Sequence, residues 1–140
     1  MPCLTARFDL SIGPILSVGI HSPGTVDLAN LQRTPPPLFF SALIDTGAKT
    51  TCISGMLAKS LGLLPAGMRP MGSATQQAIP TNTYTADLGI LFSGIFWFPE
   101  IRLWEFTPPP DSPYQLLLGG DILYKGILTI SLDGHFSFSI

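Results

Sequence analysis

The sequence is poor in charged residues. Asp, Glu, Lys and Arg make up only 11% of its 140 residues, whereas 46% are hydrophobic. Soluble domains usually carry about a quarter charged residues. So little charge predicts an apolar surface, and apolar surface on a small protein usually marks a partner-binding face. The net charge of −2, without a cluster of Lys and Arg, argues against nucleic acid as that partner.

Cysteine is almost absent as well. Cys3 and Cys52 are the two cysteines, and they lie far apart in the sequence. Two distant thiols favour neither a disulfide framework nor a metal site. We expect each to be a small apolar residue, buried or half-buried. The sequence therefore predicts no bound metal and no cofactor.

Long apolar runs are also missing. No window of 18 apolar residues occurs, and the richest stretch, residues 88–98, is interrupted by glycine and serine. The N-terminus lacks a basic region followed by a long apolar run, so it predicts no secretory signal. We expect a cytoplasmic protein without a membrane partner. The length favours one domain over residues 1–140.

One ionisable side chain stands at the end of an apolar stretch. Residues 39–44 have the pattern of a strand, and Asp45-Thr46-Gly47-Ala48 follows as a tight turn. A carboxylate in such a place is costly unless hydrogen-bond donors surround it. Asp45 is therefore a candidate functional residue. The alternative is a structural Asx turn, in which Asp45 bonds only nearby backbone N–H groups.

A second motif lies near the C-terminus. Three leucines, at 116–118, precede Gly119-Gly120-Asp121 and a predicted helical turn over residues 121–125. Together, the two motifs resemble the retroviral-type aspartic proteases, the retropepsin family, over roughly residues 13–140. In that family a strand carries Asp-Thr/Ser-Gly, a flap hairpin follows, and an apolar-apolar-Gly run enters a short helix.

The resemblance implies an all-β fold: a closed β-barrel with a flap hairpin and one or two short helices, one lobe per chain. The local patterns agree with it. Ser54 is a predicted N-cap for a helix over residues 55–61, whose Met56, Leu57 and Leu61 would face the core. Strands and hairpins are predicted over residues 4–10, 14–20, 39–44, 49–53, 68–91, 88–106, 114–118, 127–132 and 135–140. The last strand would end the chain as an unpaired apolar edge, which suits a dimer interface.

The chemistry that the resemblance implies needs two carboxylates sharing one water. This chain offers one Asp-Thr-Gly, so it implies a symmetric homodimer with Asp45 of each subunit at the two-fold axis. The catalytic residues would be Asp45, Thr46 and Gly47. A peptide or protein substrate would be bound by Ala48, Lys49, Gly72, Ser73, Ala74 and Thr75, the last four being at the flap tip. Ala48 offers no hydroxyl to the carboxylate, which predicts a less acidic pH optimum than a serine there would give.

Two positions depart from the family pattern. Many members have an acidic residue where Lys49 stands and an arginine where Gly120 stands. We expect Lys49 to form an ion pair with Asp121, in which the positive and negative partners are exchanged relative to the family. The predicted function is an aspartic endopeptidase. Two alternatives remain open: a catalytically weak or inactive peptide-binding or dimerisation module of the same fold, and a β-rich structural domain with a chance Asp-Thr-Gly.

Overall fold

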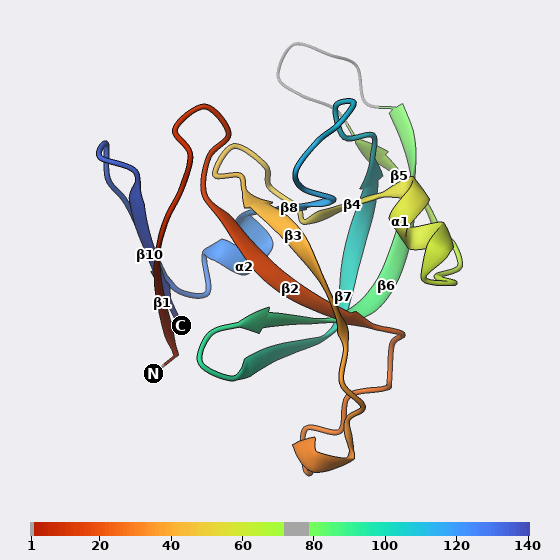
Figure 1. Ribbon diagram of the computed structural model, residues 1–140. Coiled ribbons are helices and arrows are strands. Elements are labelled where there is room, and N and C mark those ends of the chain that lie inside the picture. Colours follow the sequence, from red (N-terminus) through yellow and green to blue (C-terminus); the bar gives the residue numbers. More distant parts are fainter. Residues whose placement is uncertain (1, 72–78) are drawn as a thin grey trace.

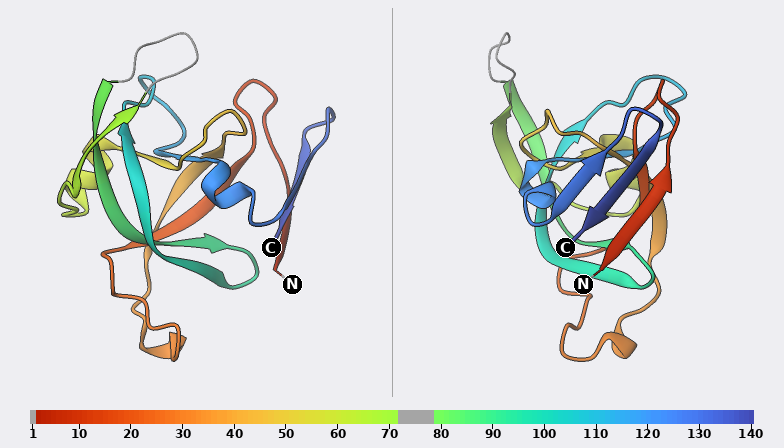
Figure 2. Two further views of the ribbon diagram at one scale, coloured as in Figure 1. Left: turned by 180° about the vertical axis from the view of Figure 1, so that it is seen from behind. Right: turned by 90° about the vertical axis from the view of Figure 1, so that its left-hand side faces the viewer.

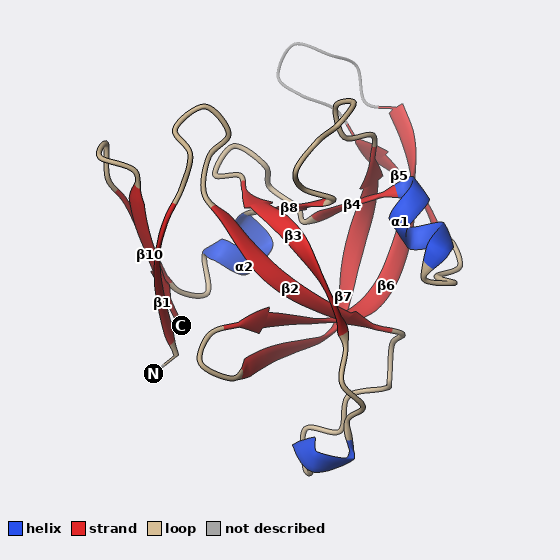
Figure 3. Ribbon diagram, in the orientation of Figure 1, coloured by secondary structure: helices blue, strands red, loops and turns tan. Residues whose placement is uncertain are grey.

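The structure is a computed structural model, and it describes residues 2–71 and 79–140 (Figure 1). It is built almost entirely from strands, with two short α-helices and one 3₁₀ turn (Figure 3). The strands are β1 (Cys3–Arg7), β2 (Ile15–His21), β3 (Leu38–Ile44), β4 (Cys52–Ser54), β5 (Gly67–Met71), β6 (Ile79–Leu91), β7 (Ile95–Phe106), β8 (Leu116–Leu118), β9 (Ile127–Ile130) and β10 (His135–Ser139). The all-β prediction is confirmed.

The larger sheet closes into a barrel. Its strands follow the order β2-β3-β8-β4-β7-β6-β5, and β2 pairs with β6 as well as with β3. Six strands therefore form a closed ring, and β5, which precedes β6 and pairs with it in a hairpin, extends the sheet beyond β6. Closure removes two of the free edges that an open sheet would expose. The predicted closed barrel is confirmed.

Parallel pairing brings distant parts of the chain together at one end of the barrel. Strand β8 lies between β3, to which it is parallel, and β4, to which it is antiparallel. Ile44 thus stands opposite Leu118, and the turn that follows β3 meets the turn that follows β8. This crossing positions the two sequence motifs side by side.

The remaining three strands form a smaller sheet in the order β1-β10-β9 (Figure 2, right). Strand β10 is hydrogen-bonded on both sides, with Cys3 opposite Ser139 and Phe136 opposite Ile130. The expectation that the C-terminal strand is an unpaired edge is therefore wrong. The N-terminal strand covers one edge of β10, and the edges of this smaller sheet are β1 and β9.

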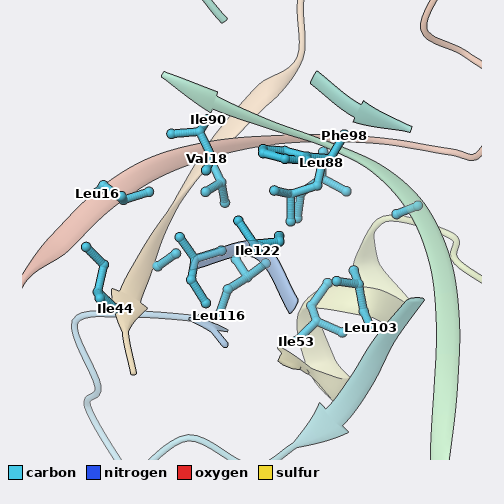
Figure 4. Packing of buried hydrophobic residues seen from close by; sticks show 14 of the residues in the cluster. Leu16, Val18, Ile44, Ile53, Leu88, Ile90, Phe98, Leu103, Leu116 and Ile122 are labelled. Carbon is cyan, nitrogen blue, oxygen red and sulfur yellow. The ribbon is translucent and has the colours of Figure 1, made fainter. Parts of the chain in front are cut away.

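A single hydrophobic cluster joins the barrel to the smaller sheet. Its buried side chains come from most strands and both α-helices, and Figure 4 shows those at the centre of the barrel. Phe136 and Phe138 point from β10 into the same cluster and are almost fully buried. Alternation of phenylalanine and serine along β10 explains this, since successive side chains of a strand face opposite sides.

The helices are shorter than predicted. Helix α1 spans Gly55–Ser60, and the Ser54 hydroxyl accepts a hydrogen bond from the Leu57 N–H, so the predicted cap is confirmed. Leu57 is buried, but Met56 is 85% exposed and does not face the core as predicted. In a helix of under two turns, adjacent positions cannot both point inward. Helix α2 spans Gly120–Leu123.

The stretch between β2 and β3 is an irregular loop containing the 3₁₀ turn η1 (Leu31–Arg33), as its prolines predict. A buried carboxylate fastens this loop to the barrel. Asp87 of β6, which has no exposed surface, accepts hydrogen bonds from the N–H groups of Val26 at 3.0 Å and Glu100 at 2.9 Å. Asp87 therefore has a structural role.

The two cysteines are both free, but they differ in exposure. Cys52 is buried, as expected, whereas Cys3 is exposed on β1, where alternate side chains face solvent. Among the described residues, no helix has the length and hydropathy needed to cross a membrane.

Candidate active site

Asp45 is the first residue after β3, at the end of the barrel where β3 and β8 meet. Its backbone N–H donates to the Leu118 carbonyl at 3.0 Å, which continues the parallel pairing by one residue. The preceding Ile44 is buried in the core, while Asp45 itself is partly exposed. A rigid buried strand thus delivers a solvent-accessible carboxylate to the surface.

The Asp-Thr-Gly-Ala segment forms a compact turn. The Gly47 N–H donates to Oδ1 of Asp45 at 3.0 Å, and the Ala48 N–H donates to the Asp45 carbonyl at 3.2 Å. The first of these bonds is the one expected of an Asx turn. Among the described residues, this bond engages Oδ1 alone and leaves Oδ2 available for a further partner.

The glycine pair of the second motif packs directly on this turn. The Gly120 N–H donates to the Ala48 carbonyl at 2.8 Å, and the Asp121 N–H donates to the Lys49 carbonyl at 3.1 Å. A Cβ atom on Gly119 would lie 2.5 Å from the backbone carbonyl of Thr50. Only glycine permits this approach, so the glycine explains how the two turns come close enough to bond.

Asp121 and Thr51 lock the two turns together. The buried Thr51 hydroxyl donates to Oδ1 of Asp121 at 2.7 Å, and the Thr51 N–H donates to Oδ2 at 3.1 Å. The same hydroxyl accepts from the Gly119 N–H at 3.2 Å. Thr51 is not among the predicted site residues. It lies six residues after Asp45, and no pattern in the neighbouring residues indicates its role, because its partner, Asp121, is 70 residues away.

The expected ion pair between Lys49 and Asp121 is not formed. Within the two described ranges, the ion pair present joins Asp133 and His135, in the β9–β10 turn. Lys49 is exposed, and the Asp121 carboxylate is already occupied by Thr51. Residues 49–51 are not part of a strand as predicted, since the strand begins at Cys52. The Lys49 carbonyl and the Thr51 side chain bond to the second turn, and the Thr51 carbonyl accepts a hydrogen bond from the Trp104 N–H of β7 at 3.0 Å.

Cys52 lies behind the turn. Burial raises the pKa of its thiol to about 11, and the negative charges of Asp121 and Asp45 add to the increase. The Thr50 side chain lowers the pKa of the thiol and so acts in the opposite direction. The Sγ–H group donates to the Thr50 carbonyl at 3.5 Å. The thiol is therefore protonated at neutral pH and is a poor nucleophile.

The remaining predicted site residues divide into two groups. Thr46, Gly47 and Lys49 are exposed beside Asp45, and Ala48 is half-buried. The two strands of the predicted flap hairpin are present. Strand β5 pairs with β6, and the paired residues run from Gly67 opposite Thr83 to Met71 opposite Ile79. Its tip residues, Gly72, Ser73, Ala74 and Thr75, lie outside the described residues.

An apolar surface adjoins the turn. Thr46 lines a cavity of about 290 Å³ together with Leu123, Tyr124, Gly126 and Leu128. Along the same segment, several large apolar side chains are exposed. We call these exposed side chains, together with Thr46, the β9 face; they are Tyr124 (83% exposed), Ile127 (64%), Ile130 (45%) and Leu132 (96%). Ile130 pairs with Phe136 and lies on the core side of the small sheet, whereas Ile127 lies on the opposite side, so the β9 face includes both sides of this sheet edge.

The described part of the chain holds no cluster of three or more His, Cys, Asp or Glu side chains suited to a metal ion. The groups gathered at the Asp45 turn are carboxylates, hydroxyls and backbone N–H groups. The Asp45 carboxylate stands beside the exposed apolar side chains of the β9 face.

The comparisons with known proteins agree with this geometry at the level of the fold. No protein-family model and no curated protein matches the sequence. Among solved structures, the chain is similar to a retropepsin-like aspartic protease from Rickettsia conorii. The TM-score is 0.62 and the identity 12%, and the match covers 97% of this chain and 89% of that one. The chain has the fold of that protease.

Proposed function

We propose that this chain is an aspartic endopeptidase that hydrolyses peptide bonds as a symmetric homodimer. The observation that carries the proposal is the placement of Asp45. Its carboxylate is partly exposed, accepts the Gly47 N–H at 3.0 Å, and stands on a turn braced by the Gly119-Gly120 segment. The fold shared with a retropepsin-like aspartic protease supports the same assignment.

Peptide hydrolysis of this kind needs a second carboxylate. One takes a proton from the attacking water, while the other, protonated, polarises the scissile carbonyl. Two other carboxylates of the chain are engaged elsewhere: Asp87 is buried and accepts hydrogen bonds from Val26 and Glu100, and Asp121 is bonded to Thr51. We therefore assign the second carboxylate to Asp45 of another copy. Two carboxylates this close retain one shared proton.

The other residues of the turn have supporting roles in this proposal. Thr46, which is exposed, would bond across the two-fold axis and hold the two turns together. Gly47 gives its N–H to the carboxylate. Ala48 and Lys49 would border an extended peptide, and Gly72, Ser73, Ala74 and Thr75 would cover it. An extended peptide with apolar side chains suits strand-like backbone bonds in such a cleft.

A second candidate function is a peptide-binding or dimerisation module that does not cleave. The observation favouring it is the exposed Lys49, which makes no ion pair with Asp121. Without a charged clamp beside the turn, the two subunits would be held mainly by apolar contact. Such a dimer could assemble without holding the two carboxylates close enough to activate water.

The decisive experiment compares the wild-type chain with Asp45→Asn on a mixed peptide library between pH 3 and pH 8. The mass in solution is measured in parallel. We expect cleavage by a wild-type dimer and its loss, by at least about a thousandfold, in the variant. The amide keeps the size of the side chain but cannot act as the base. A stable dimer that cleaves nothing at any pH supports the binding module, and an inert monomer contradicts both functions.

A further inference from the structure

A second cavity lies at the far end of β4 from the candidate active site. It encloses about 600 Å³ between the start of α1, the end of β7 and the proline-rich loop before β8. Its lining includes none of residues 45–51. Thr51, immediately before β4, belongs to the Asp45 turn, whereas Ser54, at the end of β4, lines this cavity. A strand of this length separates the two places by about 10 Å.

Glu105 is held in a fixed position at this cavity. Its Oε1 accepts a hydrogen bond of 2.5 Å from the hydroxyl of Tyr84, which is buried. The carboxylate packs against Gly55, where a Cβ atom would come within 2.8 Å of Oε1. The glycine at the start of α1 therefore makes room for the carboxylate. Within residues 2–71 and 79–140, Oε2 has no such partner, and it is available to a ligand at the cavity.

The charges around the cavity favour a cation. Its lining contains two carboxylates, those of Glu105 and Asp111, and one ammonium, that of the exposed Lys59. Asp111 also has a structural role, since its backbone has φ = 57° in a turn closed by the Ser112 N–H and the Pro109 carbonyl. Asparagine adopts this conformation as readily, so the charge at this position can be tested separately.

Apolar side chains form the rest of the wall. Met56, Phe106 and Pro108 line the cavity, and Met56 is exposed with no contact to the core. Arginine and lysine carry an apolar stem below the charged group and prefer surroundings of this mixed kind. The planar guanidinium also binds a carboxylate through two N–H groups, which lysine cannot do.

From these contacts we propose that the cavity binds the basic side chain, preferably arginine, of an extended peptide whose scissile bond lies at Asp45. Glu105 receives the guanidinium, Tyr84 positions Glu105, and Met56, Phe106 and Pro108 contact the stem. A peptide strand advances about 3.3 Å per residue, and β4 alone separates the two places by three residues, so we expect the basic residue to stand at least about three residues from the scissile bond. That the peptide is a substrate rests on the proposed function.

Direct binding tests the cavity independently of cleavage. The probes are two pentapeptides that differ at one position, arginine against the neutral isostere citrulline, added to the full-length Asp45→Asn chain. We expect the arginine peptide to shift the amide NMR signals of Gly55, Lys59 and Ser112, and to bind at least about tenfold more tightly than the citrulline peptide. Equal affinity for the two peptides, or shifts located elsewhere, would overturn the proposal.

Variants then test whether Glu105 is the carboxylate that binds the arginine side chain. Glu105→Gln should reduce the preference for arginine from about tenfold towards one, and Tyr84→Phe should reduce it in part. Glu100→Gln is the matched control, because it removes the same charge from the chain's other glutamate, outside the cavity, and should leave the preference unchanged. If Glu100→Gln and Glu105→Gln act alike, a general charge effect replaces the specific site.

Cleavage separates this proposal from the proposed function. In a peptide library, the wild-type chain should favour a basic residue at one fixed position, and Glu105→Gln should lose that preference in kcat/KM. If the wild-type chain cleaves peptides without this preference, the proposed role of the cavity is wrong and the proposed endopeptidase function stands. If the chain binds the arginine peptide at the cavity but cleaves nothing, the endopeptidase function is contradicted and the binding site stands.

Discussion

At the scale of single residues, the Asp45 carboxylate accepts its hydrogen bond from a donor in its own turn. The turn supplies the Gly47 N–H at 3.0 Å, and Ala48 supplies only its backbone. Each further donor to the charged form lowers the pKa of a carboxyl group. The residue at position 48 is therefore the simplest place to alter the pH dependence without changing the turn.

We expect Ala48→Ser to move the pH optimum of cleavage to a lower value, by about one unit. A hydroxyl bonded to a charged group contributes about 1.5 kcal/mol, which corresponds to such a shift. The measurement is kcat/KM against pH for wild type and variant. Ala48→Cys has a similar size but a weak donor, so it should retain the original optimum. An unchanged profile for the serine variant would contradict this role of position 48.

Tyr84 gives the protein a predicted loss of stability at alkaline pH. Burial, with the Glu105 carboxylate beside it, raises the pKa of Tyr84 to about 12, against about 10 in an unfolded chain. Between these values the unfolded chain releases the proton and the folded chain keeps it. The stabilising contribution is therefore complete below about pH 10 and is lost as the pH rises towards 12.

Urea unfolding at pH 7, 9 and 10.5 tests this expectation. Tyr84→Phe should lower the free energy of unfolding at pH 7 by about 1 kcal/mol, through loss of the bond to Glu105, and should flatten the decline above pH 9. Tyr124→Phe is the control, because Tyr124 is 83% exposed and should leave both quantities unchanged. Equal pH slopes in wild type and Tyr84→Phe would show that another group is responsible.

At the scale of the elements, the site depends on two turns that each follow a strand of the same parallel pair. Their mutual bonds run through Thr51, whose hydroxyl donates to Asp121 at 2.7 Å and accepts from Gly119 at 3.2 Å. Thr51 is fully buried, and so is Gly119, whereas Asp121 is exposed. Removing the hydroxyl leaves the buried Gly119 N–H without its partner and takes one hydrogen bond from the Asp121 carboxylate.

We therefore expect Thr51→Val to lower the free energy of unfolding by about 2–4 kcal/mol. Thr51→Ser keeps the hydroxyl and loses a methyl group, so it should cost about 1 kcal/mol. Chemical denaturation of the two variants beside wild type gives both values. A valine variant as stable as the serine variant would mean that packing, and not the hydrogen bonds, joins the turns.

Patterns of neighbouring residues predicted where strands, caps and turns occur better than they predicted which distant segments pair. The Asp133-Gly134 hairpin, the Ser54 cap and the Asp45 turn all follow from neighbouring residues, and the structure confirms them. The pairing of β10 with β1 joins residues at opposite ends of the chain, which no local pattern encodes. The Thr51–Asp121 bond was missed for the same reason. In its place, opposite charges suggested a Lys49–Asp121 pair that the structure lacks.

At the scale of the whole molecule, the β9 face is where a second copy would complete the site. It starts at Thr46, beside Asp45, and carries Tyr124, Ile127 and Leu132 in exposed positions. The low charge of the sequence predicted such a surface, although it did not locate it. The predicted C-terminal edge was the wrong strand, because β1 occupies that edge and β9 remains free among the described strands.

Leu132→Asp and Ile127→Asp should each weaken self-association by at least about tenfold, since a carboxylate buried at an apolar interface is costly. Sedimentation over a range of concentrations measures the dimer dissociation constant, and circular dichroism checks that the fold persists. Leu64→Asp is the control, because Leu64 is 83% exposed away from the β9 face. If all three variants associate as wild type does, the interface lies elsewhere.

The crossing of β8 between β3 and β4 also sets an order in time. Residues 45–51 leave the ribosome about 70 residues before residues 118–121, on which their turn rests. Until then, no glycine pair supports Asp45, and the barrel has no strand between β3 and β4. Contacts between such distant residues form slowly, because a long loop must close first. In a chain still being synthesised, the Asp45 turn therefore lacks its support until residues 118–121 have been added.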